Sequence, residues 1–102
     1  MAKVILEGHI VVPNSELDRI KAELATHIQL TKAEVGCLKF EVLPDLEKPN
    51  QFNVYEEFVS QADFDNHQER VKNSKWGRVT TGVERHYSIR YQECSGLNKV
   101  PC

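Results

Sequence analysis

A histidine and a glutamate are the two residues of this chain whose types and positions best suit chemistry. His67 lies one helical turn after Phe64 and one turn before Val71, so an expected helix carries an imidazole on its apolar side. Glu56 alternates with apolar residues, which places a carboxylate on the apolar face of an expected strand. If this carboxylate holds one imidazole nitrogen, the other can act as a general base near neutral pH. His67 and Glu56 are therefore predicted to be catalytic.

Both residues also have a purely structural interpretation. A histidine at the edge of a core can simply hydrogen-bond a backbone group or a carboxylate. A carboxylate on an apolar face is costly unless it is paired, and Arg85 on another expected strand is an alternative partner for Glu56. Glu57 has the opposite parity and would replace Glu56 at the site if the strand were shifted by one residue.

Five further side chains are candidates for contact with a planar substrate. They are Phe40, Tyr55, Phe58, Trp76 and His9. Aromatic residues at strand and helix spacing also form cores, so the same positions are compatible with packing alone. His9 faces either a cavity or a subunit interface, and His27, at the edge of an apolar helical stripe, is expected to be structural.

A group of basic residues follows on the second helix and its continuation. Its members are Arg70, Lys72, Lys75 and Arg78. Such a group is normally a solvated face, although a phosphate-bearing substrate could use it.

The periodicity of the apolar residues predicts four strands and two main helices. Strands are expected over residues 4–12, 38–42, 52–59 and 84–92, and helices are expected to begin near Ser15 and Ser60. Each helix start carries Ser-x-x-Asp, a pattern typical of a capping box. The second helix is interrupted at Asn73-Ser74. The order strand, helix, strand, strand, helix, strand predicts a ferredoxin-like split βαβ fold of the α+β class, with a four-stranded antiparallel sheet.

Both faces of this sheet are expected to be covered. The first strand carries Leu6 and Ile10 on one face and Ile5 and Val11 on the other. Helices cover one face only, so a second copy of the sheet is the simplest cover for the other, which predicts a homodimer. Residues 1–93 are expected to form this single domain, and residues 94–102, which lack periodicity, a tail.

Composition and motifs argue against several classes of protein. The formal charge of −2 disfavours a nucleic-acid partner. No apolar run approaches the roughly 18 residues that span a bilayer, and the early Glu7 disfavours a signal peptide, so we expect a cytoplasmic protein without a membrane partner. The chain contains no CxxC, HxH, HExxH or glycine-rich phosphate motif, and neither a metal nor another cofactor is expected.

Four segments together resemble the antibiotic biosynthesis monooxygenase family of dimeric α/β barrels, and in particular its quinol monooxygenase-like members. The segments are Glu34-x-Gly36-Cys37-Leu38-x-Phe40-x-Val42, Pro49-x-x-Phe52 with Tyr55-Glu56-x-Phe58, Phe64-x-x-His67, and the aromatic Trp76. The resemblance covers about residues 3–92 and implies a ligand site between the sheet and the helices. The haem-degrading branch is less similar, because its reactive asparagine and its haem-ligating histidine would fall near Gly8 and Gly77.

The resemblance implies a cofactor-independent monooxygenase acting on a quinol or a polyketide-like phenol. Removing a proton from such a substrate makes an anion that can itself pass an electron to oxygen, so the protein need only bind the ring, take the proton and exclude water. His67 would be the base. Two alternatives stay open: an isomerase of a small hydroxy-ketone or sugar phosphate, and a dimer that binds a small molecule without catalysis.

Overall fold

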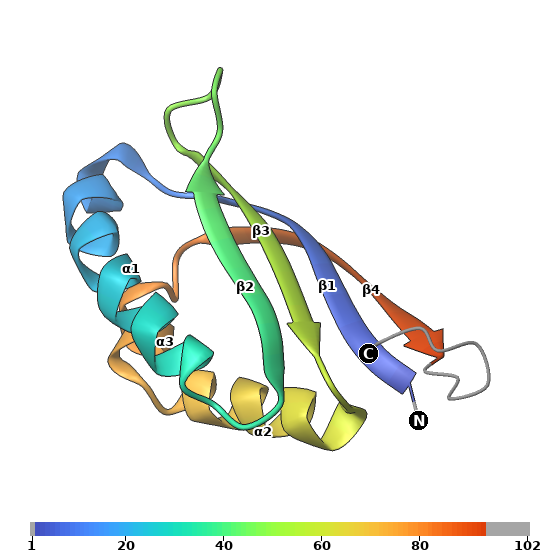
Figure 1. Ribbon diagram of the computed structural model, residues 1–102. Coiled ribbons are helices and arrows are strands. Elements are labelled where there is room, and N and C mark those ends of the chain that lie inside the picture. The colour runs from blue at the N-terminus through green and yellow to red at the C-terminus, as the bar shows by residue number, and fades with distance from the viewer. Residues whose placement is uncertain (1, 94–102) are drawn as a thin grey trace.

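Alternating apolar residues form a four-stranded antiparallel sheet in the computed structural model, which describes residues 2–93. The elements in chain order are β1 (Ala2–Val11), η1 (Asn14–Glu16), α1 (Leu17–Lys32), β2 (Cys37–Pro44), β3 (Gln51–Phe58), α2 (Gln61–Lys72), α3 (Lys75–Val79) and β4 (Glu84–Glu93). The strands lie side by side in the order β2-β3-β1-β4 (Figure 1). The predicted ferredoxin-like α+β fold is confirmed, while the predicted tail, residues 94–102, lies outside the described residues.

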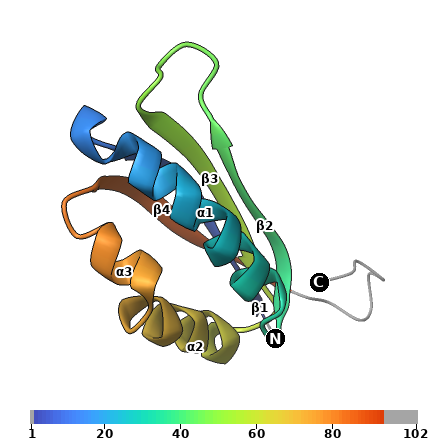
Figure 2. The same cartoon turned by 90° about the vertical axis from the view of Figure 1, so that its left-hand side faces the viewer.

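All three α-helices lie on one face of the sheet, as Figure 2 shows. The core fills the space between the two layers. Its largest fully buried apolar side chains on this side include Phe58 and Leu6 from the central strands and Ile20 from α1. The strand parities predicted for Phe52, Val54, Glu56 and Phe58 are confirmed, because all four are buried on the helix-covered face.

The start of α1 differs from the expected capping box. A single 3-10 turn precedes the helix, Glu16 is the N-cap, and no side chain caps it. A side-chain cap is worth about 1 kcal/mol, whereas burying an apolar side chain such as Ile20 contributes about 1.5–3 kcal/mol. Packing therefore outweighs capping in placing this helix.

The start of α2 agrees with the prediction. Ser60 Oγ accepts a hydrogen bond from the backbone N–H of Asp63 at 3.2 Å. Ser74 Oγ caps α3 in the same way by accepting from the N–H of Gly77 at 3.1 Å. At this corner a Cβ on Gly77 would stand 2.2 Å from the carbonyl oxygen of Val71, so the close approach of the two helices needs glycine.

The open face of the sheet is more polar than the sequence analysis expected. Ile5 is 1% exposed, but its cross-strand neighbours are Glu57 and Arg90, and long side chains pair with one another over this face. Ion pairs on this face join Lys3 to Glu57, Glu7 to Arg90 and Lys39 to Glu41. The expectation that both faces of the sheet are apolar is therefore wrong for the open face. The homodimer, which was inferred from it, stays a prediction. No helix in the described part of the chain is long and apolar enough to cross a membrane.

Candidate active site

A cavity of about 220 Å³ lies between the sheet and all three α-helices. Its polar lining includes Glu56 from β3, His67 from α2 and Arg85 from β4. Its apolar lining includes Leu6 and Trp76. The cavity thus brings the two residues predicted to be catalytic together with one of the predicted aromatic contacts.

His67 lies at the centre of this site with a carboxylate next to each ring nitrogen. Its side chain is 3% exposed, and Nδ1 stands 2.7 Å from Oε2 of Glu34 and 3.2 Å from Oε1. Nε2 stands 3.6 Å from Oε1 of Glu56, which is beyond hydrogen-bond distance. The partner that holds the imidazole is therefore Glu34. The prediction from the sequence, which gave this role to Glu56, is wrong.

Glu34 reaches His67 because the loop after α1 lies directly against α2. In this loop Gly36 adopts a φ of +85°, and a Cβ there would stand 2.3 Å from a side-chain oxygen of Asp63. Glycine alone tolerates both the backbone conformation and the close approach. Sequence reasoning missed Glu34 because nothing in the local pattern marks it as a neighbour of a residue 33 positions away.

Arg70 holds the far side of the same carboxylate. Its Nε donates to Glu34 Oε1 at 2.5 Å, and its Nη2 donates to Oγ1 of the buried Thr31 at 2.9 Å. Arg70 follows His67 by three residues, so α2 presents an imidazole and a guanidinium on one face. This His-x-x-Arg spacing is the one signal in the sequence that could have indicated that His67 and Arg70 share an acidic partner other than Glu56.

The partners of His67 determine its tautomer. An ionised carboxylate only accepts hydrogen bonds, so Glu34 assigns the proton of neutral His67 to Nδ1 and leaves the lone pair of Nε2 on the cavity side. Burial lowers the pKa of His67, and nearby Arg70 acts in the same direction, while Glu34 opposes both. His67 is therefore a neutral imidazole at pH 7, as a general base must be.

Glu56 differs from an ordinary glutamate in its protonation state. Burial, together with the negative charge of Glu34, raises the pKa of Glu56 to about 8. Its Oε1 atom is buried and has no hydrogen-bond partner. Arg85, the alternative partner, instead donates to Thr80 and Val83. Glu56 is therefore mostly a neutral carboxylic acid at pH 7.

A stacked pair forms another wall of the cavity. The rings of His27 and Trp76 lie 4.6 Å apart and nearly parallel, with an interplanar angle of 7°. His27 is 5% exposed, and burial, followed by electrostatic interactions with His67 and Arg70, lowers its pKa to about 3. The position of His27 at the edge of an apolar helical stripe predicts a structural role, and the structure also places His27 in the cavity wall.

The remaining predicted contacts divide between the two faces of the sheet. Phe40 and Phe58 are buried on the helix-covered face, where their ring centroids lie 5.9 Å and 4.8 Å from that of His67. Tyr55 lies on the open face, where its hydroxyl donates to Glu57 and Lys39 sits over its ring. His9 lies on the same open face and stacks on His86 at 4.7 Å. The sheet therefore separates Tyr55 and His9 from the cavity.

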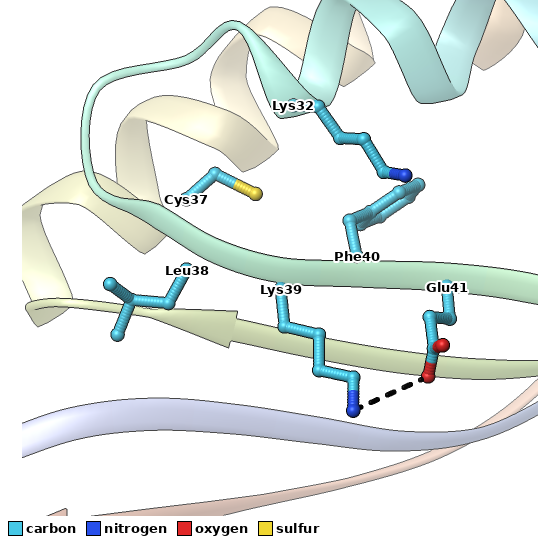
Figure 3. Close-up of a pocket in the computed structure, with 6 residues that line it drawn as sticks. All are labelled: Lys32, Cys37, Leu38, Lys39, Phe40 and Glu41. Atoms are coloured by element: carbon cyan, nitrogen blue, oxygen red, sulfur yellow. Dashed lines mark ion pairs between the residues drawn. The ribbon is translucent and has the colours of Figure 1, made fainter.

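A larger hollow, of about 360 Å³, has a different character. It lies along β2, the strand at one edge of the sheet, and includes Phe40 and Cys37 in its lining. Figure 3 shows Lys39 and Glu41 on one side of this strand and Cys37, Phe40 and Lys32 on the other. The hollow therefore wraps around an exposed strand edge and does not enclose a ligand. Within residues 2–93 no group of three or more histidine, cysteine or acidic residues is placed to hold a metal ion.

The profile of one protein family matches residues 4–76, which is most of the chain. That family is the antibiotic biosynthesis monooxygenases. The chain belongs to this family. The matched region contains most of the residues that line the cavity, among them Glu56, His67 and Trp76, and it also contains Glu34 and Arg70, which hold His67.

Solved structures share the fold across nearly the whole chain. A Nitrosomonas europaea protein named for the same family is 19% identical, with 88% of this chain and 96% of its own covered and a TM-score of 0.74. A Bacteroides thetaiotaomicron protein of unknown function, described as a possible oxidoreductase, is 10% identical, with 88% and 97% covered and a TM-score of 0.77. A Deinococcus radiodurans protein named for the family is 18% identical, with 93% of each chain covered and a TM-score of 0.70. At these identities the similarity shows the fold. No curated protein matches the sequence.

Proposed function

We propose that this member of the family is a cofactor-independent monooxygenase that oxidises a small quinol or polyketide-like phenol in the cavity between sheet and helices. The observation that carries the proposal is the environment of His67. Its Nδ1 is held by Glu34, which is itself held by Arg70, and its Nε2 lies on the cavity side. A buried imidazole with one nitrogen anchored and the other facing a cavity is arranged as a general base.

The proposed reaction begins with proton transfer from the substrate hydroxyl to Nε2 of His67. The imidazolium that forms is stabilised by the Glu34 carboxylate, 2.7 Å from Nδ1. The phenolate then passes an electron to molecular oxygen, and the two radicals combine to form a carbon–oxygen bond. The peroxide anion takes the proton back from the His67 imidazolium, which gives a hydroperoxide and restores the neutral base. Loss of water from the resulting hydroperoxide completes the balance, in which a quinol and one oxygen molecule give a hydroxyquinone and one water.

In this scheme Trp76 and His27 supply a flat wall against which an aromatic ring can stack. Phe40 and Phe58 lie behind His67 and exclude water from its ring. Exclusion of water strengthens the contact between the imidazolium and Glu34 and protects the reactive anion. The cavity side chains thus supply binding and proton transfer, while the substrate supplies the electrons.

Oxygen uptake with a panel of quinols and naphthols tests the proposal. His67→Ala should abolish most of the uptake, because general-base catalysis is typically worth about 10²–10⁴-fold. His86→Ala is the matched control, since His86 lies on the open face and outside the cavity. Equal uptake by the His67→Ala variant and the wild type, with both folded by circular dichroism, would contradict the proposal.

An isomerase acting on a small hydroxy-ketone is the second candidate function. The observation that favours it is the pairing of a neutral acid with a neutral base, Glu56 and His67, 3.6 Å apart in one cavity. The sugar-phosphate version has less support, because Arg70 and Lys75 are already paired with Glu34 and Glu23. Conversion of substrate under strict exclusion of oxygen would favour the isomerase, and binding without conversion under air would favour a non-catalytic role.

A further inference from the structure

Two buried polar atoms in the cavity wall have no hydrogen-bond partner among the described residues, Nδ1 of His27 and Oε1 of Glu56. Of these two, Oε1 of Glu56 lies 3.6 Å from Nε2 of His67, the proposed base. The side chain of Glu56 is 8% exposed. Arg85 lines the same cavity but donates its hydrogen bonds to Thr80 and Val83. A buried polar atom left unpaired destabilises a protein, so a group in this position is expected to find its partner in a ligand.

The protonation state of Glu56 determines what that partner must offer. Because burial and Glu34 raise the pKa of Glu56 to about 8, the group carries a proton at pH 7 and can donate a hydrogen bond as well as accept one. His67 presents the complementary function, an imidazole lone pair at Nε2, only 3.6 Å from Oε1 of Glu56. The cavity therefore holds one donor and one acceptor side by side.

We propose that the cavity selects ligands in which a hydroxyl group and a carbonyl-containing substituent are attached to neighbouring atoms of a small ring system, the hydroxyl donating to Nε2 of His67 and the carbonyl oxygen accepting from Glu56. The inference rests on the proposed function for the role of His67 as base. It narrows that function, because, of the two proposed substrate types, only the phenols that carry a carbonyl group beside the hydroxyl fit this ligand class. The volume of about 220 Å³ is below the range of roughly 300–1,000 Å³ of drug-sized pockets, which favours one or two rings.

This two-point recognition excludes close analogues for a physical reason. A simple phenol would satisfy His67 but leave the proton of Glu56 without an acceptor. A ketone without a hydroxyl would satisfy Glu56 but leave the lone pair of His67 without a donor. Each unsatisfied buried group weakens binding, and we expect about tenfold for each.

Three commercial compounds form a matched set for the test: 2′-hydroxyacetophenone, phenol and acetophenone. Binding is measured by two-dimensional NMR on the full chain, where Trp76, the only tryptophan of the sequence, gives a single indole signal at the cavity wall. The expected result is that 2′-hydroxyacetophenone binds about tenfold more tightly than either of the other two. Equal affinities, or no binding of 2′-hydroxyacetophenone, would overturn the inference.

Two variants separate the donor from the shape of the side chain. Glu56→Gln keeps a donor of similar size and should preserve the preference for 2′-hydroxyacetophenone over phenol. Glu56→Met keeps the volume but removes the donor, and should reduce that preference to about one. Glu57→Gln, on the opposite face, is the control and should leave it unchanged. Loss of the preference in Glu56→Gln, or its survival in Glu56→Met, would contradict the role of Glu56.

A pH comparison adds an independent readout. Ionisation of Glu56 above pH 8 removes its donor, so the preference should fall between pH 6.5 and 9 in the wild type and persist in Glu56→Gln. The other titratable or charged groups that line this cavity are His27, His67, Arg85 and Tyr87. A preference that falls equally in both proteins would assign the pH dependence to one of these groups and contradict the proposal.

The binding assay tests the ligand class and the oxygen assay tests the monooxygenase, so either proposal can be refuted without the other. Selective binding of 2′-hydroxyacetophenone without oxygen uptake on any phenol or quinol would retain the ligand class and remove the proposed monooxygenase. Oxygen uptake on phenols that carry no carbonyl, with equal binding of all three compounds, would retain the monooxygenase and remove the ligand class.

Discussion

Glu56 and Glu57 are adjacent in the sequence, yet β3 directs their side chains to opposite faces of the sheet and into opposite environments. On the helix-covered face, burial and the charge of Glu34 raise the pKa of Glu56 to about 8. On the open face, hydrogen bonding to Lys3 lowers the pKa of Glu57. The same residue type is thus mostly a neutral acid at pH 7 on one face and an ionised carboxylate on the other, because only one face is covered by helices.

The histidines follow the same division. His67 and His27 are buried in the helix-covered layer, and the pKa of each is lowered chiefly by burial. His9 and His86 stack on each other on the open face, where the side chain of His86 is 55% exposed. Residue type alone therefore does not identify the reactive groups of this sheet. The reactive groups are identified by exclusion of water, which differs between the two faces of the sheet.

The largest effect is expected from Glu34, whose carboxylate connects the helix-covered site to Arg70. Glu34→Gln keeps a hydrogen-bond acceptor for Nδ1 but removes the charge that stabilises the His67 imidazolium. We expect turnover of an oxidised quinol to fall by about 10²–10⁴-fold, as in other His–carboxylate pairs. Glu34 raises the pKa of His67, so its replacement should also shift the acidic limb of the pH–rate profile to lower pH, which a merely structural role would not cause. Glu57→Gln, assayed in parallel, should retain turnover, and equal losses in both variants would break the comparison.

The pH dependence of stability is expected to separate the two glutamates next. Glu56 is protonated in the folded state and ionised in the unfolded state between pH 4.5 and about 8, so it lowers stability as the pH rises through this range. The cost between pH 5 and pH 9 is about 4 kcal/mol. Urea denaturation should show that Glu56→Gln removes this loss.

Glu57→Gln should have the opposite signature. The lowered pKa of Glu57 contributes stability above its ordinary pKa, and that stability is lost as the pH falls. The variant should therefore be less stable than the wild type at neutral pH and should approach it in acid. The same pH profile of stability for both variants would contradict the opposite pKa shifts of Glu56 and Glu57 on the two faces.

His27 provides the corresponding test in acid. Because its pKa is lowered to about 3, the unfolded chain binds a proton below pH 6.5 that the folded chain does not bind, and stability falls as the pH falls. His27→Phe keeps a ring that can stack on Trp76. Between neutral pH and pH 4.5, the unfolding free energy of this variant should fall by about 3 kcal/mol less than that of the wild type. Equal acid dependence of the His27→Phe variant and the wild type would contradict this account of His27.

The smallest effect is expected from the ion pair between Lys3 and Glu57. Pairs near a protein surface contribute about 0–1 kcal/mol, so Lys3→Met should change the unfolding free energy of the single chain by no more than this.

If a second copy covers the open face, the same change should also weaken the dimer, and light scattering at several concentrations would detect it. A monomer at micromolar concentration would contradict the predicted homodimer.

The order of elements and the direction of most side chains could be predicted from the sequence. Alternation in β3 correctly assigned Glu56 and Glu57 to opposite faces, and helical spacing correctly placed His67 on the buried side of α2. The Ser60 cap of α2 was also predicted correctly, whereas the similar pattern at Ser15 does not cap α1. These successes depend on local geometry, since strand and helix periods set which side chains share a face.

The partners of the reactive groups could not be predicted in this way. Glu34 holds His67 across 33 positions of sequence, through the docking of the α1–β2 loop onto α2 that Gly36 permits. Likewise, His9 and Tyr55 share no cavity with His67, although each is aromatic and each lies on a central strand. Such pairings depend on how the layers pack, which no single segment encodes.

The sequence by itself therefore determined the α+β fold, the strand parities and the presence of an imidazole and a carboxyl group on the covered face. Only the tertiary structure decided that Glu34 anchors His67, that Oε1 of Glu56 is buried without a hydrogen-bond partner, and that charged side chains cover the open face. The physical reason is that periodicity is a property of one segment, whereas burial and charge pairing, which set the pKa of each group, arise where distant segments meet.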